Sequence, residues 1–243
     1  AIPNLKIESA NYKSNITTGA WRAPYTNFLA FAEQSFFDEV AEALNQDAVQ
    51  LRLDLLNNVD EGADDRIQYS ASRMKEVIKL AAEKGDWNNT SDGIYKGFSA
   101  YYSHNTHVAE VAEISIQNGM PKVERVTAAV DCGIVINPTG ANNQVVGGVL
   151  DGIGHAMYGD FTFEAGKPSA SNFDTYRLIR MNETPKVAVH FIDSEIAPTG
   201  LGEPGLPPAG GAVANAIKAA TGKRLLKQPF TKYLAETESE VKG

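Results

Sequence analysis

The first third of the chain carries apolar residues at spacings of three and four, which is the pattern of amphipathic helices. One such stripe lies between Asn27 and Asn45 and consists of Leu29, Ala32, Phe36, Val40 and Leu44. Asp47 is placed to cap a second, shorter helix, and Ser70 or Ser72 can cap a third that ends at Gly85. We therefore expect a helical part over about residues 27–85.

From Gly93 onward, aromatic and β-branched residues replace the helical spacing. Three segments, 95–102, 108–117 and 122–132, read as strands. The dipeptide Asn118-Gly119 between the last two is typical of a tight hairpin turn. The pattern predicts an antiparallel meander.

Gly140 to Tyr158 reads as a buried helix with a glycine-rich face, since its apolar residues keep a strict spacing of four: Val145, Val149, Ile153 and Met157. After it we expect a hairpin turning at Gly166-Lys167-Pro168, a strand over 186–194, a rigid loop over 198–208 and a helix over 209–221. The strand and glycine-rich helix part thus covers about 93–230. The predicted fold class is α+β, with antiparallel strands and segregated helices.

Composition narrows the function. The 243 residues carry 22 basic and 30 acidic side chains, a net charge of −8, so we expect no nucleic-acid partner. No run approaches the roughly 20 apolar residues of a membrane-spanning helix, and none is expected. With Cys132 as the one cysteine, the chain can form neither an internal disulfide nor an iron-sulfur site of its own. Any redox chemistry needs a borrowed cofactor.

Glu203 is the strongest candidate for acid-base chemistry. It is the one carboxylate in a loop of glycine, proline and leucine residues that runs from Pro198 to Pro208. Burial there would disfavour its charged form and suit a general base. Alternatively, the carboxylate merely lies near the positive end of the next helix. The residues alone leave these two interpretations even.

The glycine-rich helix allows a ligand to approach its backbone, but close helix packing explains the glycines equally well. Gln144 at its edge could read a heterocycle or be a plain surface residue. Trp21-Arg22 could form the wall of a planar or anionic site, with a packed Trp and a surface Arg as the alternative. His104 and His107 form HxxH, but their odd spacing on a strand points them to opposite faces, so we do not expect a metal site there.

Several segments, taken in order, resemble the C-terminal part of the large subunit of molybdenum hydroxylases of the xanthine oxidase superfamily. The similarity is strongest to the branch of isoquinoline 1-oxidoreductase beta subunits and aldehyde dehydrogenase large subunits. It extends over nearly the whole chain, and the segments that carry it are Gly19-Ala-Trp-Arg22, Ala30 to Glu39, Val130 to Pro138, Gln144-Val-Val-Gly-Gly148, Gly152-Ile-Gly154, Asn172 to Tyr176 and Gly202 to Pro208.

The resemblance implies a C-terminal molybdopterin-binding region and a molybdopterin cofactor with molybdenum, in its cytosine dinucleotide form. It implies that Glu203 is the base that takes a proton from the attacking oxygen, while none of the residues binds the metal directly. It sets Trp21 and Arg22 near the metal or substrate. The residues implied to contact the cofactor are Gln144, Gly147, Gly148 and Gly202.

The resemblance also implies an oxidoreductase that hydroxylates an aldehyde or an N-heterocycle with oxygen from water and passes electrons to 2Fe-2S clusters in a small partner subunit. The family's glycine-rich pterin loops are missing from this chain, so we expect residues 1–243 to be a fragment or split subunit that needs an N-terminal partner and is inactive alone. We expect the interface around Gln144 and the 198–208 loop, because Leu201, Leu206, Pro207 and Pro208 are apolar. The alternative is a non-catalytic assembly or binding domain of the same fold. A bacterial cytoplasm and a periplasm both remain open as locations.

Overall fold

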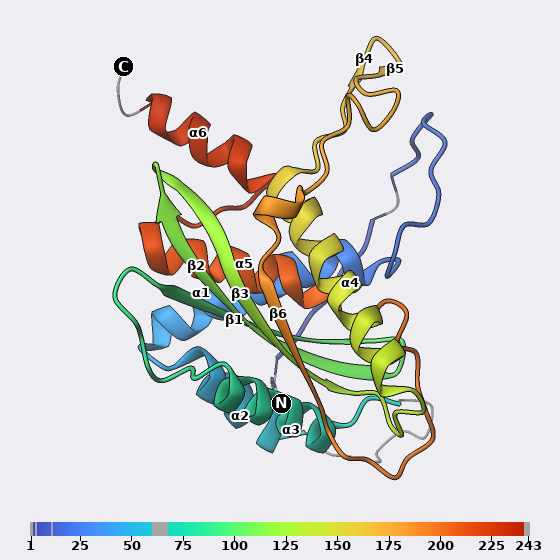
Figure 1. Cartoon of the computed structure of the whole chain (residues 1–243), viewed down its shortest axis with the longest axis vertical. Helices are drawn as coiled ribbons and strands as arrows, with labels where there is room; N and C mark the ends of the chain where they lie inside the picture. Colours follow the sequence, from blue (N-terminus) through green and yellow to red (C-terminus); the bar gives the residue numbers. More distant parts are fainter. Residues whose placement is uncertain (1, 3, 11, 60–67, 241–243) are drawn as a thin grey trace.

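A mixed four-stranded sheet lies at the centre of the molecule, with helices on both faces (Figure 1). The computed structural model describes residues 2, 4–10, 12–59 and 68–240. The strand order is β1-β2-β3-β6. The bounds of these strands are β1 Tyr95–Ser103, β2 Thr106–Gln117, β3 Met120–Asp131 and β6 Lys186–Phe191.

The predicted meander is confirmed, because β1, β2 and β3 pair antiparallel in succession. Asn118 and Gly119 turn the second hairpin, with φ values of 52° and 79°. The last strand differs from the prediction, since β6 pairs parallel to β3. The helix α4 (Pro138–Tyr158) provides the crossover that a parallel connection requires. The α+β class is confirmed, with one parallel pair at the edge.

The predicted helices of the first third are confirmed as α1 (Thr26–Leu44), α2 (Ala48–Asn57) and α3 (Ala71–Lys84). Asp47 caps α2 by accepting hydrogen bonds from the N–H groups of Val49 and Gln50, each at 2.9 Å. Ser70, rather than Ser72, is the N-cap residue of α3. Gly85 ends α3 as the glycine pattern predicts.

The glycine-rich segment forms α4 as predicted, and all four of its regularly spaced apolar residues are buried: Val145, Val149, Ile153 and Met157. The side chain of Asn137 caps the helix by accepting from the N–H of Gly140. A Cβ on Gly152 would lie 2.6 Å from the carbonyl oxygen of Leu206. This glycine therefore lets the loop before the next helix lie directly on α4.

Several boundaries differ from the sequence prediction, and the strand predicted over 186–194 ends at Phe191. The small hairpin of β4 (Phe163–Glu164) and β5 (Lys167–Pro168) turns at Ala165 and Gly166, both with positive φ, so Lys167-Pro168 belongs to the strand. The helix α5 (Pro207–Thr221) begins two residues before Ala209, because prolines fit the first turn of a helix. It ends at Gly222 as predicted, and α6 (Phe230–Glu240) follows.

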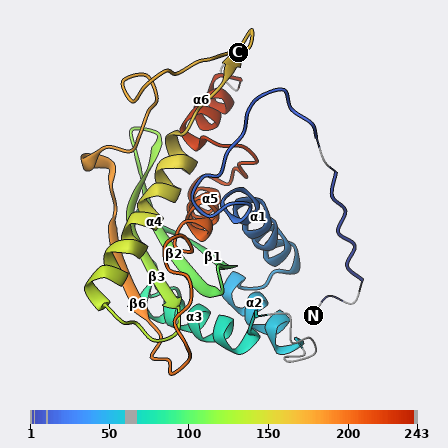
Figure 2. The same cartoon turned by 90° about the vertical axis from the view of Figure 1, so that its right-hand side faces the viewer.

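Helices flank the sheet in Figure 2, and each face of the sheet has its own apolar core. Val108, Ala112 and Ile114 of β2 face α4 and α5, whereas Ala109 and Val111 of the same strand face α2 and α3. This alternation is the two-residue period of a strand buried on both sides. The helix α5 lies very close to β1, since a Cβ on the strand's Gly97 would be only 2.1 Å from the carbonyl oxygen of Ala212.

The apolar stripe of α1 does not face the core. Its large members Leu29, Phe36 and Leu44 are 42%, 62% and 60% exposed. The buried face of the helix consists instead of small and polar residues: Ala30, Gln34, Ser35 and Ala41. Close packing against α5 explains this choice, because a Cβ on Gly211 of α5 would already lie 2.8 Å from Cβ of Gln34.

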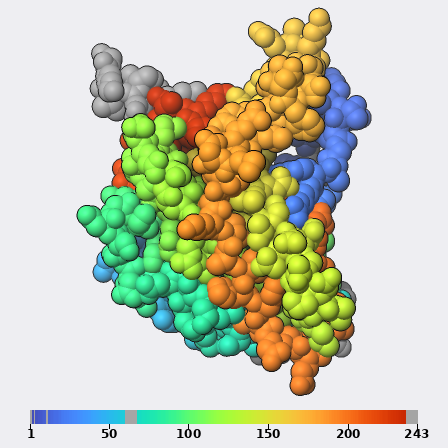
Figure 3. All heavy atoms as spheres, in the orientation of Figure 1, coloured from blue at the N-terminus to red at the C-terminus, as the bar shows by residue number. Residues whose placement is uncertain are grey.

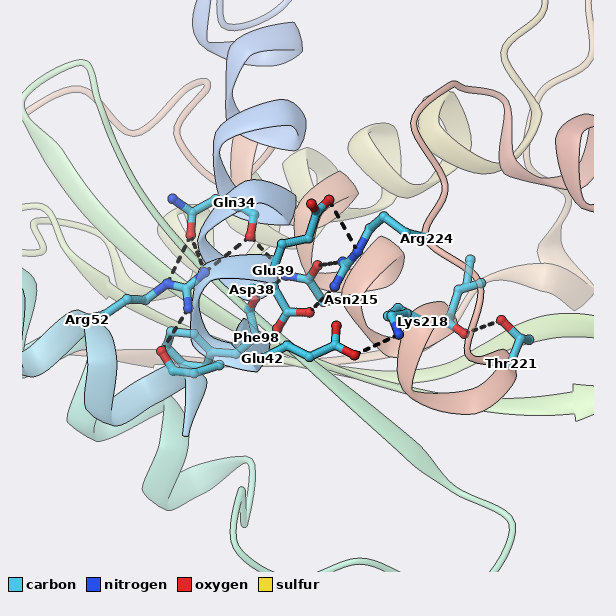
Figure 4. A network of polar contacts seen from close by, with 12 residues as sticks. Gln34, Asp38, Glu39, Glu42, Arg52, Phe98, Asn215, Lys218, Thr221 and Arg224 are labelled. Atoms are coloured by element: carbon cyan, nitrogen blue, oxygen red, sulfur yellow. Dashed lines mark hydrogen bonds and ion pairs between the residues drawn. The ribbon is translucent and has the colours of Figure 1, made fainter. Parts of the chain in front are cut away.

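A polar network joins α1, α2, β1 and α5 (Figure 4). Arg52 donates to the side-chain oxygen of Gln34 through Nε and Nη2, and Asn215 donates to the backbone carbonyls of Gln34 and Phe98. Burial lowers the pKa of Arg52 to about 10, although nearby carboxylates including Asp38 oppose the change. The guanidinium therefore stays charged at neutral pH and fixes the relative positions of the helices.

Candidate functional site

The loop between β6 and α5 carries Glu203 and is anchored to the ends of the central strands. The N–H of Thr199 donates to the carbonyl of Cys132 at 2.9 Å, and that of Gly200 donates to the carbonyl of His104 at 3.1 Å. The hydroxyl of Thr106 donates to the Gly200 carbonyl at 2.6 Å. These contacts hold the first half of the loop against the β1–β2 turn.

The second half of the loop lies against α4. Figure 3 shows the preceding segment with β6, in orange, running alongside α4, in yellow-green. A Cβ on Gly148 of α4 would lie 3.3 Å from backbone atoms of Gly205 and Leu206, and one on Gly205 would lie 3.1 Å from the carbonyl of Val145. The contact is thus backbone against backbone. It fixes the loop immediately after Glu203.

The Glu203 carboxylate receives contacts on both oxygens. Oε1 accepts a hydrogen bond from the backbone N–H of Ala23 at 2.8 Å, and Oε2 lies 2.7 Å from Nε2 of His104. The carboxylate side chain is 33% exposed, so it is only partly buried. The first two residues of α5, Pro207 and Pro208, have no N–H to offer it. The carboxylate is therefore held by Ala23 and His104 and not by the first two residues of α5, and the role of Glu203 as a base stays a prediction.

The carbonyl oxygen of Gly202 joins three separate segments. Arg22 donates to it through Nε at 3.0 Å and Nη2 at 2.7 Å, and Gln144 of α4 donates through Nε2 at 2.8 Å. Arg22 Nη2 also lies 3.2 Å from the carbonyl of Gln144. The structure thus brings together Glu203, Gln144, Gly202 and Arg22, as the resemblance implied.

Trp21 packs on the outer side of this junction. Its ring lies 4.4 Å from that of His155, centroid to centroid, and burial lowers the pKa of His155. A cleft of about 610 Å³ opens here, lined by Trp21, Pro24, Tyr25 and Phe28 among others. Trp21 is the one site residue in its lining, while Arg22, Gln144, Gly202 and Glu203 lie next to it. A larger cleft of about 750 Å³ between α1 and α5 is lined by none of these residues. We place the candidate site beside the first cleft because the polar contacts converge there.

The three glycines implied to contact a cofactor lie in different surroundings. A Cβ on Gly202 would meet only Gln144 Nε2, at 3.8 Å, and one on Gly147 only Arg22 Nη1, at 3.9 Å. Both positions expose backbone to a ligand. Gly148 is buried against Gly205, which agrees with the packing alternative for the glycines of α4. A cofactor contact at Gly148 stays a prediction.

We expected the 198–208 loop to form an interface because four of its residues are apolar. This reason is wrong, since these residues do not face solvent. Leu206, Pro207 and Pro208 are buried in the core of the chain itself, and Leu201 packs against that core. The two prolines are the first turn of α5, and a helix seated on a sheet buries its first turn. The exposed residues of the loop are Pro198, Gly200 and Gly202, and Gln144 beside it is exposed as well.

His104 is the site residue that sequence reasoning missed. It lies in the turn between β1 and β2 and reaches Glu203, whereas His107 is buried in β2 against the rings of Tyr69 and Tyr102. In the sequence, His104 was considered only as part of an HxxH pattern, for which we did not expect a metal site. Within the described ranges, no group of three or more His, Cys, Asp or Glu residues could hold a metal ion. No signal along the chain connects His104 with Glu203, because folding alone makes the pair.

The surface around Gly202 fits a cofactor such as molybdopterin. Bare backbone at Gly147 and Gly202 lies beside the Gln144 amide and the Arg22 guanidinium, and these are the donor types that polar heterocycles and phosphates accept. Residues 29–185 match the model of the molybdopterin cofactor-binding domain family. None of the described helices is long and apolar enough to cross a membrane.

Similar proteins extend over most of the chain. Isoquinoline 1-oxidoreductase subunit beta of Brevundimonas diminuta is 29% identical over 241 residues, covering 97% of this chain and 29% of that protein. The membrane-bound aldehyde dehydrogenase [pyrroloquinoline-quinone] of Gluconacetobacter polyoxogenes is 30% identical over 225 residues, covering 87% of this chain and 29% of that protein. The chain therefore spans less than a third of these relatives.

A solved structure supports the fold. The aldehyde oxidoreductase of Desulfovibrio gigas superposes with a TM-score of 0.70 at 15% identity, over 89% of this chain and 41% of that one. At this identity the likeness concerns architecture alone. The family model, which matches more than half of the chain, confirms the molybdopterin-binding domain that the sequence motifs implied: the chain belongs to the molybdopterin cofactor-binding domain family.

Proposed function

We propose that this chain forms part of the active site of a molybdenum-dependent oxidoreductase, in which Glu203 is the general base. The reaction is the hydroxylation of an aldehyde or of a carbon in an N-heterocycle, with water as the source of oxygen. The observation that carries the proposal is the Glu203 carboxylate, held on one oxygen by the Ala23 N–H and on the other by His104. Relatives named for isoquinoline and aldehyde oxidation support both substrate classes.

Glu203 accepts the proton that the attacking oxygen loses. Each of its oxygens has a second lone pair beyond the contact with Ala23 or His104, so the carboxylate can be held and still act as an acceptor. Its partial exposure keeps one side open to a reactant. When bound, molybdopterin supplies a molybdenum centre that takes up the electron pair removed from the substrate.

Gln144, Gly147 and Gly202 offer the cofactor an amide and open backbone, with Gly148 seating the helix that carries two of them. We assign the cytosine dinucleotide form of the cofactor on the family resemblance. Trp21 lines the cleft beside the site, and Arg22 binds the Gly202 carbonyl next to it, so we assign both residues to the substrate or metal side of the site.

The chain acts together with the rest of a longer large subunit and with a small subunit that carries 2Fe-2S clusters, to which the electrons pass. Its short span relative to the curated relatives supports the first partner. The exposed apolar stripe of α1, with Phe36 and Leu44 at its centre and end, is a surface suited to such a contact.

The test is Glu203→Gln in the assembled enzyme. The amide keeps the size of the carboxylate but does not accept the proton, so turnover should fall by about two to four orders of magnitude. Molybdenum content should stay at the wild-type level. Glu195→Gln, which changes an exposed carboxylate earlier in the same loop, is the matched control.

The loss should appear in the reduction of the enzyme by substrate and not in its re-oxidation. A wild-type rate in Glu203→Gln would instead favour the second candidate, a non-catalytic assembly domain of the same fold. The two-sided contact at Glu203 favours catalysis, because an assembly domain has no need of a positioned carboxylate.

A further inference from the structure

His104 contacts the proposed base, yet the proposed function gives it no role. Its Nε2 atom lies 2.7 Å from Oε2 of Glu203, opposite the oxygen that accepts from Ala23. A carboxylate with one donor on each oxygen loses rotation about its last two torsions. His104 and Ala23 together therefore fix the plane of the carboxylate.

The backbone of His104 is itself fixed. The residue has a φ of 55°, in the left-handed region, and its carbonyl accepts from the N–H of Gly200 at 3.1 Å. Gly200 belongs to the loop that carries Glu203. The turn and the loop are thus tied to each other twice, once through the backbone and once through the side chains of His104 and Glu203.

The other nitrogen of the imidazole has a buried partner. Nδ1 of His104 lies 2.7 Å from Oγ of Ser103, which is 3% exposed and lies 3.0 Å from Oγ1 of Thr26. The Thr26 hydroxyl donates to the carbonyl of Ala23 at 3.1 Å. The contacts form a closed ring from Glu203 through His104, Ser103 and Thr26 back to Ala23.

The Ser103 hydroxyl supports the tautomer that Glu203 requires. Because Nε2 faces the carboxylate at 2.7 Å, the ring proton lies on Nε2, and Ser103 donates to Nδ1. The single hydrogen of the Thr26 hydroxyl then serves the Ala23 carbonyl or Ser103 Oγ, both of which lie within 3.1 Å.

We propose that His104 is the positioning residue of Glu203, oriented by Ser103 at Nδ1 and donating to the carboxylate through Nε2. The proposal rests on the proposed function for its catalytic meaning. Its structural content, the fixed N–H of His104 and the fixed plane of Glu203, stands on the contacts alone.

The contact is tested in the chain itself by NMR of ¹⁵N-labelled histidine. The neutral His104 ring should carry its proton on Nε2, and Nδ1 should show the shift of a hydrogen-bond acceptor. Ser103→Ala should move the Nδ1 signal, and Glu203→Ala should move the Nε2 signal. His190, on β6, is the internal control and should not respond. His104 signals that ignore both substitutions would overturn the proposal.

The catalytic meaning is tested in the assembled enzyme with His104→Leu and His104→Gln. The glutamine offers an N–H at nearly the same reach, and the leucine offers none. We expect kcat to fall about ten- to a hundredfold in His104→Leu, as for a misplaced reacting group, with KM and molybdenum content near wild type. His104→Gln should recover most of the loss.

The possible outcomes separate the two proposals. If Glu203→Gln loses turnover but both His104 variants keep the wild-type kcat, the positioning role is wrong and the proposed function stands. Equal losses in both His104 variants also overturn it, because the donor would then not matter. If Glu203→Gln keeps its turnover, the proposed function fails, while the NMR experiment still decides whether His104 holds Glu203.

Discussion

Arg22 donates two hydrogen bonds to the carbonyl oxygen of Gly202, at 2.7 and 3.0 Å, from the opposite end of the sequence. The carboxylate of Glu203 and the carbonyl of Gly202 therefore take their positions from the same turn, since Ala23 binds one and Arg22 the other. The orientation of the base and the surface offered to the cofactor are set together.

Replacing Arg22 with lysine should separate these two effects. A lysine keeps the charge but has no planar fork, so it does not reproduce the paired donation to Gly202. We expect Arg22→Lys to retain less molybdenum in the assembled enzyme while the chain unfolds at nearly the wild-type temperature. Metal analysis and a thermal melt measure the two quantities. Lys227→Arg, at an exposed position after α5, is the control variant.

Gly97→Ala should destabilise the whole fold. The added methyl group would lie 2.1 Å from the Ala212 carbonyl and 2.2 Å from the Ala216 nitrogen, and α5 would have to move as a body. Overpacking of this kind costs roughly 3 kcal/mol. Chemical denaturation measures the loss. Gly19→Ala, where nothing lies within 4 Å, should change the free energy of unfolding by less than about 0.5 kcal/mol.

Glu110 should make stability depend on pH. Its side chain is fully buried on β2, neither oxygen has a hydrogen-bond partner, and burial raises its pKa well above the ordinary 4.5. The folded chain keeps a proton that the unfolded chain releases, so the free energy of unfolding falls as pH rises above 4.5. Each pKa unit of the shift contributes about 1.4 kcal/mol.

Glu110→Gln should therefore be similar to wild type near pH 4 and more stable at pH 8, with a difference that grows between the two values. Denaturation curves across this range test the expectation. Glu164→Gln, on the exposed strand β4, should show no such growth. A difference that is constant with pH would mean that Glu110 is not neutral in the folded chain.

The purified chain should fold but hold no molybdenum and turn over no substrate. It supplies Gln144, Gly202 and Glu203 to one side of the site, and the other side would be open to water. Metal analysis after purification from cells that make molybdopterin tests this. Near-stoichiometric molybdenum in the chain alone would show that one side is enough.

Local patterns predicted the ends of helices well where a single residue sets the end. Asp47, Gly85 and Gly222 end or begin helices because each supplies a cap or a backbone geometry that others lack. The four-residue spacing of α4 gave its buried face correctly. The same logic failed for α1, because the sequence does not say which face of a helix meets α5, and Phe36 lies outside while Gln34 lies inside.

The family resemblance named Glu203, Gln144 and Gly202 as site residues, and the structure places them together. Their roles toward a cofactor or substrate stay predictions. His104 could not be found in this way, because its contact depends on how the β1–β2 turn meets a loop far away in the sequence. The parallel pairing of β6 with β3 could not be predicted for the same reason, because it also depends on a contact between segments far apart in the sequence.

The close approach of α5 to Gly97 has a consequence for biosynthesis. The contact joins β1 to a helix near the end of the chain, so a growing polypeptide can complete its meander long before α5 leaves the ribosome. Until then the groove over Gly97 stays open, and the loop that carries Glu203 has no anchor at its far end. The part of the molecule proposed to do the chemistry therefore forms after the meander that supports it.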